Sequence, residues 1–315
     1  MYHRHSPNSW NFALGFPGLG VMLLRKDETL VAEVGSPAVR RRELGALLRA
    51  LRTEKGLTVE QVAEQLLCSP SKVSRMETGQ GAATLRDIRD LSNLYGVTDE
   101  SSREHLMRLA LEGKQQGWWQ AYDLPYEKYV GLEEEAVSIH GYQSSVVPGL
   151  LQTTDYARAL HEAAEPKLSP EIIERRVEVR LIRQQLLARE RPPRFVEVID
   201  EAALHRVVGG VAVMRRQLER LMEACRLPYV TIQVVPFSVG AHPALESNFK
   251  ILELPAPSPD VVYVEGLVGS FYLERAEELD SFNRVFEKLQ AMALDPDKSV
   301  ELITDICAAI ADYTS

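Results

Sequence analysis

The chain has 315 residues, of which 45% are hydrophobic, 36 are Lys or Arg and 45 are Asp or Glu. This length suggests two domains, and the apolar fraction is typical of a globular protein rather than of a disordered chain. No run of about 18 apolar residues occurs, which excludes a membrane-spanning helix. The three cysteines lie far apart, at Cys68, Cys225 and Cys307, a spacing that argues against a disulfide framework and against a zinc site. We therefore expect a cytoplasmic protein with no metal and no other cofactor.

The formal net charge of −9 is unevenly distributed. Residues 37–98 hold 10 basic and 7 acidic side chains, whereas residues 99–315 hold 23 basic and 35 acidic ones. A mildly basic segment is thus attached to an acidic body. This asymmetry permits DNA binding by the first part and disfavours it for the second.

Residues 1–36 have the composition of an extension rather than of a domain. Pro7, Gly15 and Pro17 interrupt them, and no helical period is visible. Residues 12–24 are apolar enough to resemble the core of a secretory signal, but Gly and Pro break the run and no small-residue cleavage site follows. We therefore predict a disordered extension over residues 1–36.

A helical unit begins after this extension. The first helix has four leucines at helical spacing on one face: Leu44, Leu47, Leu48 and Leu51. Gly56 ends this helix, because glycine adopts a left-handed conformation easily. Thr58 and Gln61 then stand at the spacing of a capping box, which starts a second short helix.

Ser69 and Pro70 mark the start of a third helix, with a capping hydroxyl followed by proline at the first helical position. Gly79 closes that helix, and two more apolar periods predict a fourth helix near residues 85–95 and a fifth from Asp99. Residues 37–117 therefore read as an all-α domain. Within it, two short helices joined by about four residues predict a helix-turn-helix.

The segment LTVEQVAEQLLCSPSKVSRMETG, residues 57–79, resembles the phage-repressor-like (XRE-type) helix-turn-helix family. In that family a small residue at the position of Ala63 lets the helices pack closely, Val73 is the buried aliphatic residue, and Glu77 precedes the closing turn. The resemblance implies that four side chains face the major groove and that Lys72 lies nearer to phosphate. The four are Pro70, Ser71, Ser74 and Arg75.

The chemistry of these residues agrees with that assignment. The guanidinium of Arg75 can donate two hydrogen bonds to guanine, the commonest base-specific contact. Thr58 and Ser69 lie at helix starts, where backbone N–H groups can bind phosphate. Three consecutive arginines come before the first predicted helix and are expected to reach the DNA backbone or a minor groove: Arg40, Arg41 and Arg42.

Two residues depart from the family pattern. Leu67 stands where the family usually has Gly, because that turn residue tends to adopt a positive φ; Leu there costs roughly 1 kcal/mol or changes the turn. Val59 replaces a Gln that commonly contacts phosphate. A helical bundle used only for protein contacts is the alternative, but the order of caps, Val73 and Glu77 favours DNA binding.

Beyond residue 117 the pattern alternates between helices and strands. It predicts strands near residues 137–145, 195–199, 230–235, 249–254 and 261–264, and helices near residues 155–164, 169–189, 214–225, 276–293 and 297–311. The strands show no regular βαβ spacing. Residues 118–315 are therefore expected to form a larger mixed domain, and the whole chain is α+β.

Several strings in this body resemble one family of regulators. HGYQSSVVPGLLQTTDYARAL, RRVEVRLIRQQLL and VVYVEGLVGSFYLE resemble the C-terminal domain of an actinobacterial, antitoxin-like (DUF5753-like) regulator family. The resemblance implies a transcriptional regulator with a small neighbouring protein as a partner. A loop of the body is the candidate surface for a partner or a ligand, and His242 is a further candidate residue. The loop residues are Val147, Pro148, Gly149, Leu150 and Leu151.

No catalytic motif is recognisable in the body, so we expect no enzyme. The favoured function is a sequence-specific regulator that binds double-stranded DNA as a homodimer and whose acidic domain contacts an effector, a partner or a second copy. The alternative is an antitoxin-like protein that sequesters a small protein encoded nearby and represses its own operon. An enzyme with an appended DNA-binding module is the third, disfavoured possibility.

Overall fold

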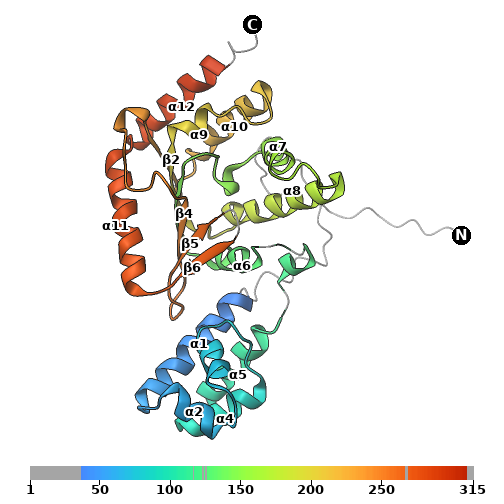
Figure 1. Ribbon diagram of the computed structural model, residues 1–315, viewed down its shortest axis with the longest axis vertical. Helices are drawn as coiled ribbons and strands as arrows, with labels where there is room; N and C mark the ends of the chain where they lie inside the picture. The colour runs from blue at the N-terminus through green and yellow to red at the C-terminus, as the bar shows by residue number, and fades with distance from the viewer. Residues whose placement is uncertain (1–36, 116, 123, 125, 267–268, 311–315) are drawn as a thin grey trace, which may run out of the picture. The chain divides into compact units, whose positions relative to one another are not determined.

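A computed structural model describes residues 37–115, 117–122, 124, 126–266 and 269–310. The predicted extension over residues 1–36 lies outside the described residues. Five helices form the N-terminal part of the described chain (Figure 1): α1 (Pro37–Glu54), α2 (Val59–Gln65), α3 (Pro70–Glu77), α4 (Leu85–Tyr95) and α5 (Glu100–Glu112).

The start and stop signals that the sequence predicts for these helices are confirmed. Thr58 caps α2 in a capping box with Gln61, and the hydroxyl of Ser69 accepts a hydrogen bond from the Lys72 N–H at the start of α3. Gly56 and Gly79 both have a φ of +66° at the ends of α1 and α3. Each helix of the helix-turn-helix is therefore bounded by local chemistry.

The five helices share one hydrophobic core, to which Leu48, Val62, Val73 and Ile88 contribute fully buried side chains. Helix α1 packs unusually close to the end of α3 at Gly45. A Cβ added there would lie 2.6 Å from the backbone oxygens of both Met76 and Glu77, so no larger residue fits without movement. Close packing at this glycine fixes α3 against α1.

The rest of the described chain combines helices with a sheet. Its α-helices are α6 (Glu127–Glu135), α7 (Thr154–Ala164), α8 (Pro170–Gln184), α9 (Glu201–His205), α10 (Val211–Ala224), α11 (Ala276–Met292) and α12 (Pro296–Ile310). Its strands are β1 (Ser138–Gln143), β2 (Arg194–Asp200), β3 (Val230–Val235), β4 (Phe249–Glu253), β5 (Val261–Glu265) and β6 (Ser270–Leu273). Short 3-10 helices are η2 (Trp118–Tyr122), η3 (Gly149–Leu151), η4 (Gln185–Ala188) and η5 (Phe237–Val239). Within these described segments, no helix has the length and apolar character that crossing a membrane requires.

The strands form one mixed sheet in the order β3-β2-β1-β4-β5-β6. Strands β1, β2 and β3 are parallel, and the helices α7 to α10 connect them. Strands β4, β5 and β6 continue the sheet in antiparallel fashion. The α+β class is confirmed, and the first three strands form parallel βαβ units although their spacing in the sequence is not regular.

Helices cover both faces of this sheet (Figure 1). One face packs α10 and α12 into a core with Ile139, Phe195 and Leu218, whereas α11 lies along the other face and contributes Phe286 and Leu289. Strand β2 is buried from Phe195 to Ile199, whereas the edge strand β3 alternates between buried and half-buried residues along its first four positions. The centre of the parallel part of the sheet is therefore enclosed, and its edge strand is partly exposed.

One ion pair lies inside the sheet itself. Lys250 on β4 and Glu197 on β2 meet across β1 at Gly141, and both side chains are buried. A Cβ on Gly141 would lie 2.6 Å from a carboxylate oxygen of Glu197. Glycine at this position of β1 therefore leaves the space in which the two charges can pair.

Candidate nucleic-acid interface

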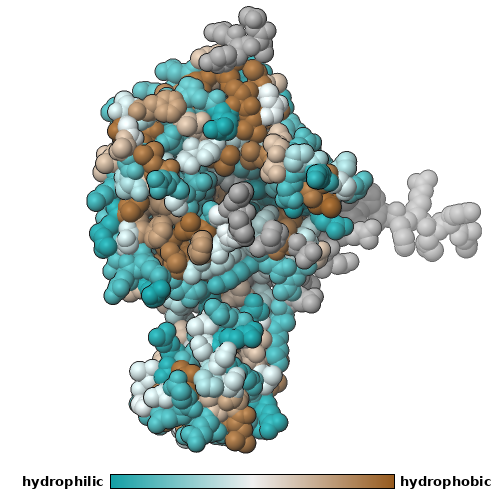
Figure 2. All heavy atoms as spheres, viewed as in Figure 1, coloured by the Kyte–Doolittle hydropathy of each residue, from teal (hydrophilic) through white to brown (hydrophobic). Residues whose placement is uncertain are grey.

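The side chains of α3 divide into a buried and an exposed set. Val73 and Met76 point into the core, whereas Ser71, Ser74 and Arg75 are exposed to solvent. Ser69 and Pro70 at the start of the helix are exposed as well. On the face that Figure 2 shows, the helix-turn-helix part of the molecule is mostly polar, with hydrophobic residues only in small separate patches. The exposed face of α3 is thus short, polar and accessible.

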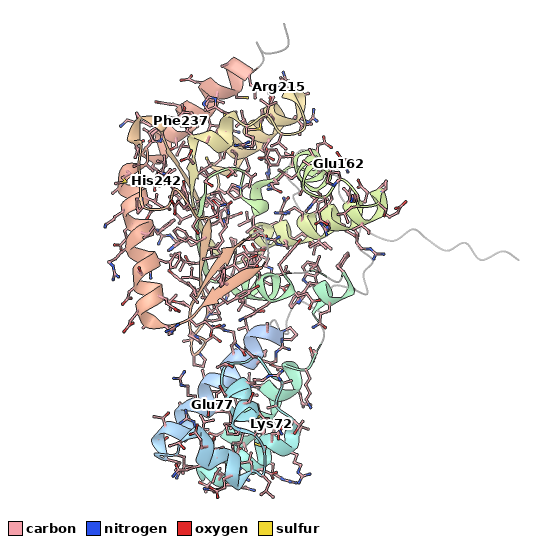
Figure 3. The ribbon with its side chains drawn as sticks, viewed as in Figure 1. Lys72, Glu77, Glu162, Arg215, Phe237 and His242 are labelled. Carbon is pink, nitrogen blue, oxygen red and sulfur yellow. The ribbon has the colours of Figure 1, made fainter. Side chains whose placement is uncertain are left out.

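The far end of α3 is anchored by a charged pair. Arg52 of α1 donates two hydrogen bonds to the carboxylate of Glu77, at 2.7 and 3.0 Å, and a third to the backbone oxygen of Leu57, at 2.7 Å. Because Glu77 is nearly buried, this bidentate contact holds the C-terminal end of α3 to α1 and to the start of α2. Figure 3 shows Glu77 and Lys72 apart from each other on α3.

Arg75 and Lys72 differ in whether their charged groups have a partner within the protein. The guanidinium of Arg75 makes neither a hydrogen bond nor an ion pair with any residue in the described part of the chain, so its donors are available to a ligand. The ammonium of Lys72 instead lies 2.5 Å from a carboxylate oxygen of Asp87 on α4. Nothing in the sequence indicated the contact between Lys72 and Asp87, because 15 residues separate the two.

Thr58 is exposed at the start of α2, as the phosphate assignment requires. Its own N–H donates to the Gln61 side chain at 2.8 Å, and its hydroxyl accepts from the Gln61 N–H at 3.3 Å. The carboxylate of Glu60 lies at the same helix start, where hydrogen bonds from its own backbone N–H and from Thr58 lower its pKa. A negative charge here opposes phosphate, which sequence reasoning missed.

The three arginines do not form an arm ahead of the first helix, because α1 already begins at Pro37. Arg40 pairs with Glu43 and Glu112, and Arg41 donates to the backbone oxygen of Gly113 at 2.8 Å. The expectation of free arginines before the helix is therefore wrong, since their charges are used inside the protein.

Arg42 is the most buried of the three, with 4% of its surface exposed. Its guanidinium donates to the carboxylate of Glu274 and, at 3.0 Å, to the backbone oxygen of Pro259. All these residues belong to the single compact unit of residues 35–315. Arg42 therefore serves internal packing of that unit.

The candidate partner loop is buried rather than exposed. Val147, Pro148, Leu150 and Leu151 all lie in the interior, and Gly149 is half-buried. The expectation that these residues form a surface for a partner or a ligand is therefore wrong for the apolar side chains, which belong to the core.

Glutamine side chains hold the backbone of this loop. Gln152 donates to the oxygen of Val147 at 2.7 Å, Gln184 to those of Gly149 and Gln152 at 3.1 and 2.6 Å, and Gln217 to that of Leu151 at 2.8 Å. The amides thus supply hydrogen bonds to carbonyl groups of the loop, as buried polar groups require. The side chains of Gln184 and Gln217 thereby tie the loop to α8 and α10.

His242 is also enclosed, with its imidazole among Tyr142, Asp200 and Ala244. Its Nε2 lies 3.2 Å from the Tyr142 hydroxyl and 3.4 Å from a carboxylate oxygen of Asp200, and the Ala244 N–H donates to its Nδ1 at 3.3 Å. Every ring nitrogen thus has a partner within the protein. Figure 3 shows His242 in the part of the molecule that also holds Phe237. His242 is buried, so it offers no exposed surface to a partner or a ligand.

Comparison with known proteins identifies the larger part of the chain. Residues 126–305, more than half of the sequence, match the family described as Domain of unknown function (DUF5753). The chain belongs to the DUF5753 family. In this DUF5753 protein, residues 43–106 match the model described as Helix-turn-helix domain, which covers α2, α3 and α4. The comparisons thereby confirm that the chain has a helix-turn-helix domain and a DUF5753 domain, as the two resemblances implied.

One curated relative is similar to the N-terminal part of this DUF5753 protein. The HTH-type transcriptional activator BcrR of Enterococcus faecalis is 39% identical over 70 residues. These residues make up 22% of this chain and 34% of BcrR, so the similarity spans about a third of the relative's length. No solved structure matches.

Proposed function

We propose that this protein is a sequence-specific DNA-binding transcriptional regulator that inserts α3 into the major groove. The observation that carries the proposal is the exposed side of α3, where Arg75 is unpaired among the described residues while Val73, Met76 and Glu77 hold the helix in place. An α-helix fits the major groove, and a free guanidinium can read guanine there. The transcriptional role named for BcrR supports the same function.

The proposed base-reading residues are Ser71, Ser74 and Arg75, with Pro70 and Ser69 at the end of α3 that enters the groove. Serine hydroxyls are short and can pair with donors or acceptors on base edges. Thr58 stays a candidate phosphate contact, although Glu60 opposes it. Arg40, Arg41 and Arg42 are left out of the proposed interface, because each is bound within the protein.

The acidic part of the chain is proposed as the part that joins two protomers, or that contacts an effector or partner, rather than DNA. Residues 118–315 carry 31 acidic against 20 basic side chains, a net negative charge that repels a phosphate backbone. A single helix-turn-helix contacts few bases, and dimers of such domains bind half-sites about 34–36 Å apart. We therefore propose a homodimer on DNA. A DNA target also places the protein in the cytoplasm, where its three free cysteines stay reduced.

The test is selection of bound sequences from a random duplex library by the full-length protein, followed by affinity measurements with Arg75→Ala. The loss should be about 1–3 kcal/mol on the selected site, with relaxed preference at one base pair. Arg49→Ala is the matched control, because Arg49 is an exposed arginine of α1 in the same domain. Equal effects of the two variants, or no enriched sequence, would contradict the proposed function.

The stoichiometry is tested on the selected site with the full chain. Light scattering should give two protomers per duplex, and footprinting should show two protected segments one helical turn apart. A single protomer that protects one half-site would contradict the dimer while leaving the DNA-binding proposal intact.

A further inference from the structure

Asp87, the third residue of α4, is held rigidly at the start of that helix. Its Oδ2 accepts hydrogen bonds from the Thr84 N–H at 2.9 Å and from the Thr84 hydroxyl at 2.7 Å. Its own N–H donates back to the Thr84 hydroxyl oxygen at 3.1 Å. Only 7% of Asp87 is exposed. This capping box fixes the position of the carboxylate, because moving it would leave the start of α4 uncapped.

The other oxygen of the same carboxylate is directed at α3. Oδ1 lies 2.5 Å from the ammonium of Lys72, whose side chain is 45% exposed. Burial alone would raise the pKa of Asp87, but the hydrogen bonds from Lys72 and Thr84 outweigh it and lower that pKa. Asp87 therefore stays ionised at neutral pH and pairs with Lys72. The cap needs only Oδ2, so helix capping alone does not account for the second contact.

The pairing changes what Lys72 can do near DNA. A free surface lysine attracts phosphate regardless of base sequence, and each phosphate neutralised adds about 0.9 to the slope of log Kd against log salt. A phosphate that approaches Lys72 must share the ammonium with a carboxylate that cannot move away and that repels it. Arg75, in contrast, has no such competitor among the described residues.

We infer that Asp87 is a positioning residue that lowers affinity for DNA: by restraining and neutralising Lys72, it limits phosphate binding to DNA of any sequence. This inference rests on the proposed function. It assigns a role to a residue that does not itself touch DNA.

The test uses the full-length protein and a fluorescein-labelled duplex of about 24 base pairs with a scrambled sequence, with anisotropy measured between about 50 and 200 mM NaCl. Asp87→Asn keeps an oxygen acceptor for the Thr84 cap but removes the charge. It should bind this duplex about three- to ten-fold more tightly, with a salt slope steeper by about 0.9. Affinity for the selected site should rise by a similar factor, because a phosphate contact does not depend on base sequence.

Glu54→Gln is the matched control, because it removes the same charge from an exposed residue of α1 in the same domain. It should change nonspecific affinity much less than Asp87→Asn does. The double variant Lys72→Gln/Asp87→Asn should lose the gain, because the released ammonium is gone. An equal gain in Glu54→Gln, or a gain that persists without Lys72, would overturn the inference.

A second measurement is independent of how well Asp87→Asn folds. In the otherwise unchanged protein, Lys72→Gln should lower the salt slope by less than half of the roughly 0.9 expected for a free phosphate contact. A full loss of about 0.9 would show that Lys72 binds phosphate without restraint and would refute the inference. If the unchanged protein binds no duplex in a salt-dependent manner, the proposed function itself fails.

Discussion

Leu67, in the turn between α2 and α3, combines two unfavourable features. It is the one non-glycine residue with positive φ in the described chain, at +51°, and 94% of its surface is exposed. A left-handed conformation costs an L-residue with a side chain roughly 1–2 kcal/mol relative to glycine. Because the side chain packs against nothing, its removal leaves no cavity.

Leu67→Gly should therefore stabilise the helix-turn-helix. Relief of strain contributes about 1–2 kcal/mol, and the greater freedom of glycine in the unfolded chain offsets about 0.5–1 kcal/mol of it. The net gain is about 0.5–1 kcal/mol. The gain in stability can be measured by hydrogen exchange of the backbone amides of α2 and α3 in the full-length protein. This exchange should slow by a factor of about two to five.

Leu111→Gly is the matched control for this measurement. Leu111 is also an exposed leucine, at 52%, but it has helical backbone geometry in the last turn of α5, where glycine costs up to about 1 kcal/mol relative to a good helix former. The two substitutions should therefore have opposite signs. If Leu67→Gly speeds exchange as Leu111→Gly does, the assignment of backbone strain to Leu67 is wrong.

Three further substitutions test other contacts. Gly141→Ala should destabilise the sheet domain by about 3 kcal/mol or more in urea unfolding, because it separates a buried ion pair. Gly269→Ala should be nearly neutral, because no atom of the described residues lies within 4 Å of the added Cβ. Burial, and then the nearby arginines of α8, lower the pKa of His161 to about 4 from 6.5, so the unfolded chain takes up a proton first as the pH falls. The unchanged protein should therefore lose more free energy of unfolding between pH 7 and 5 than His161→Gln does. Equal losses in the two proteins would contradict this prediction. Arg52→Met should leave the carboxylate of Glu77 nearly buried and unpaired, and circular dichroism should show destabilisation of about 2–3 kcal/mol; an unchanged unfolding curve would contradict the anchoring role.

The helix-turn-helix could be predicted closely because its signals are local. Thr58, Ser69, Gly56 and Gly79 act on their own helix ends, and the structure has each of them in the expected role. Of the two alternatives at Leu67, a strained positive φ or a changed turn, the structure has the positive φ. Capping and left-handed turns depend on neighbours within a few residues, which a sequence displays directly.

The body was harder to predict because its determinants are distant in sequence. Helix α6 and strand β6 were missed, and the parallel pairing of β1, β2 and β3 cannot be read from their spacing. Apolar residues such as Leu150 look alike in a core and in a binding loop until the partners of the loop are known. Likewise, nothing near Arg42 or Lys72 in sequence announces Glu274 or Asp87.

Helix α3 separates the residues that keep it in place from those that it presents to solvent. Val73, Met76 and Glu77 make its internal contacts, and the exposed positions beside them contribute little to the core. Surface substitutions away from such contacts usually change stability by less than about 0.5 kcal/mol. Exposed positions of this helix such as Ser71 and Ser74 can therefore drift, or be randomised in the laboratory, while the fold persists. Substitutions at these positions can therefore change what α3 presents to a ligand, one residue at a time, without unfolding the domain.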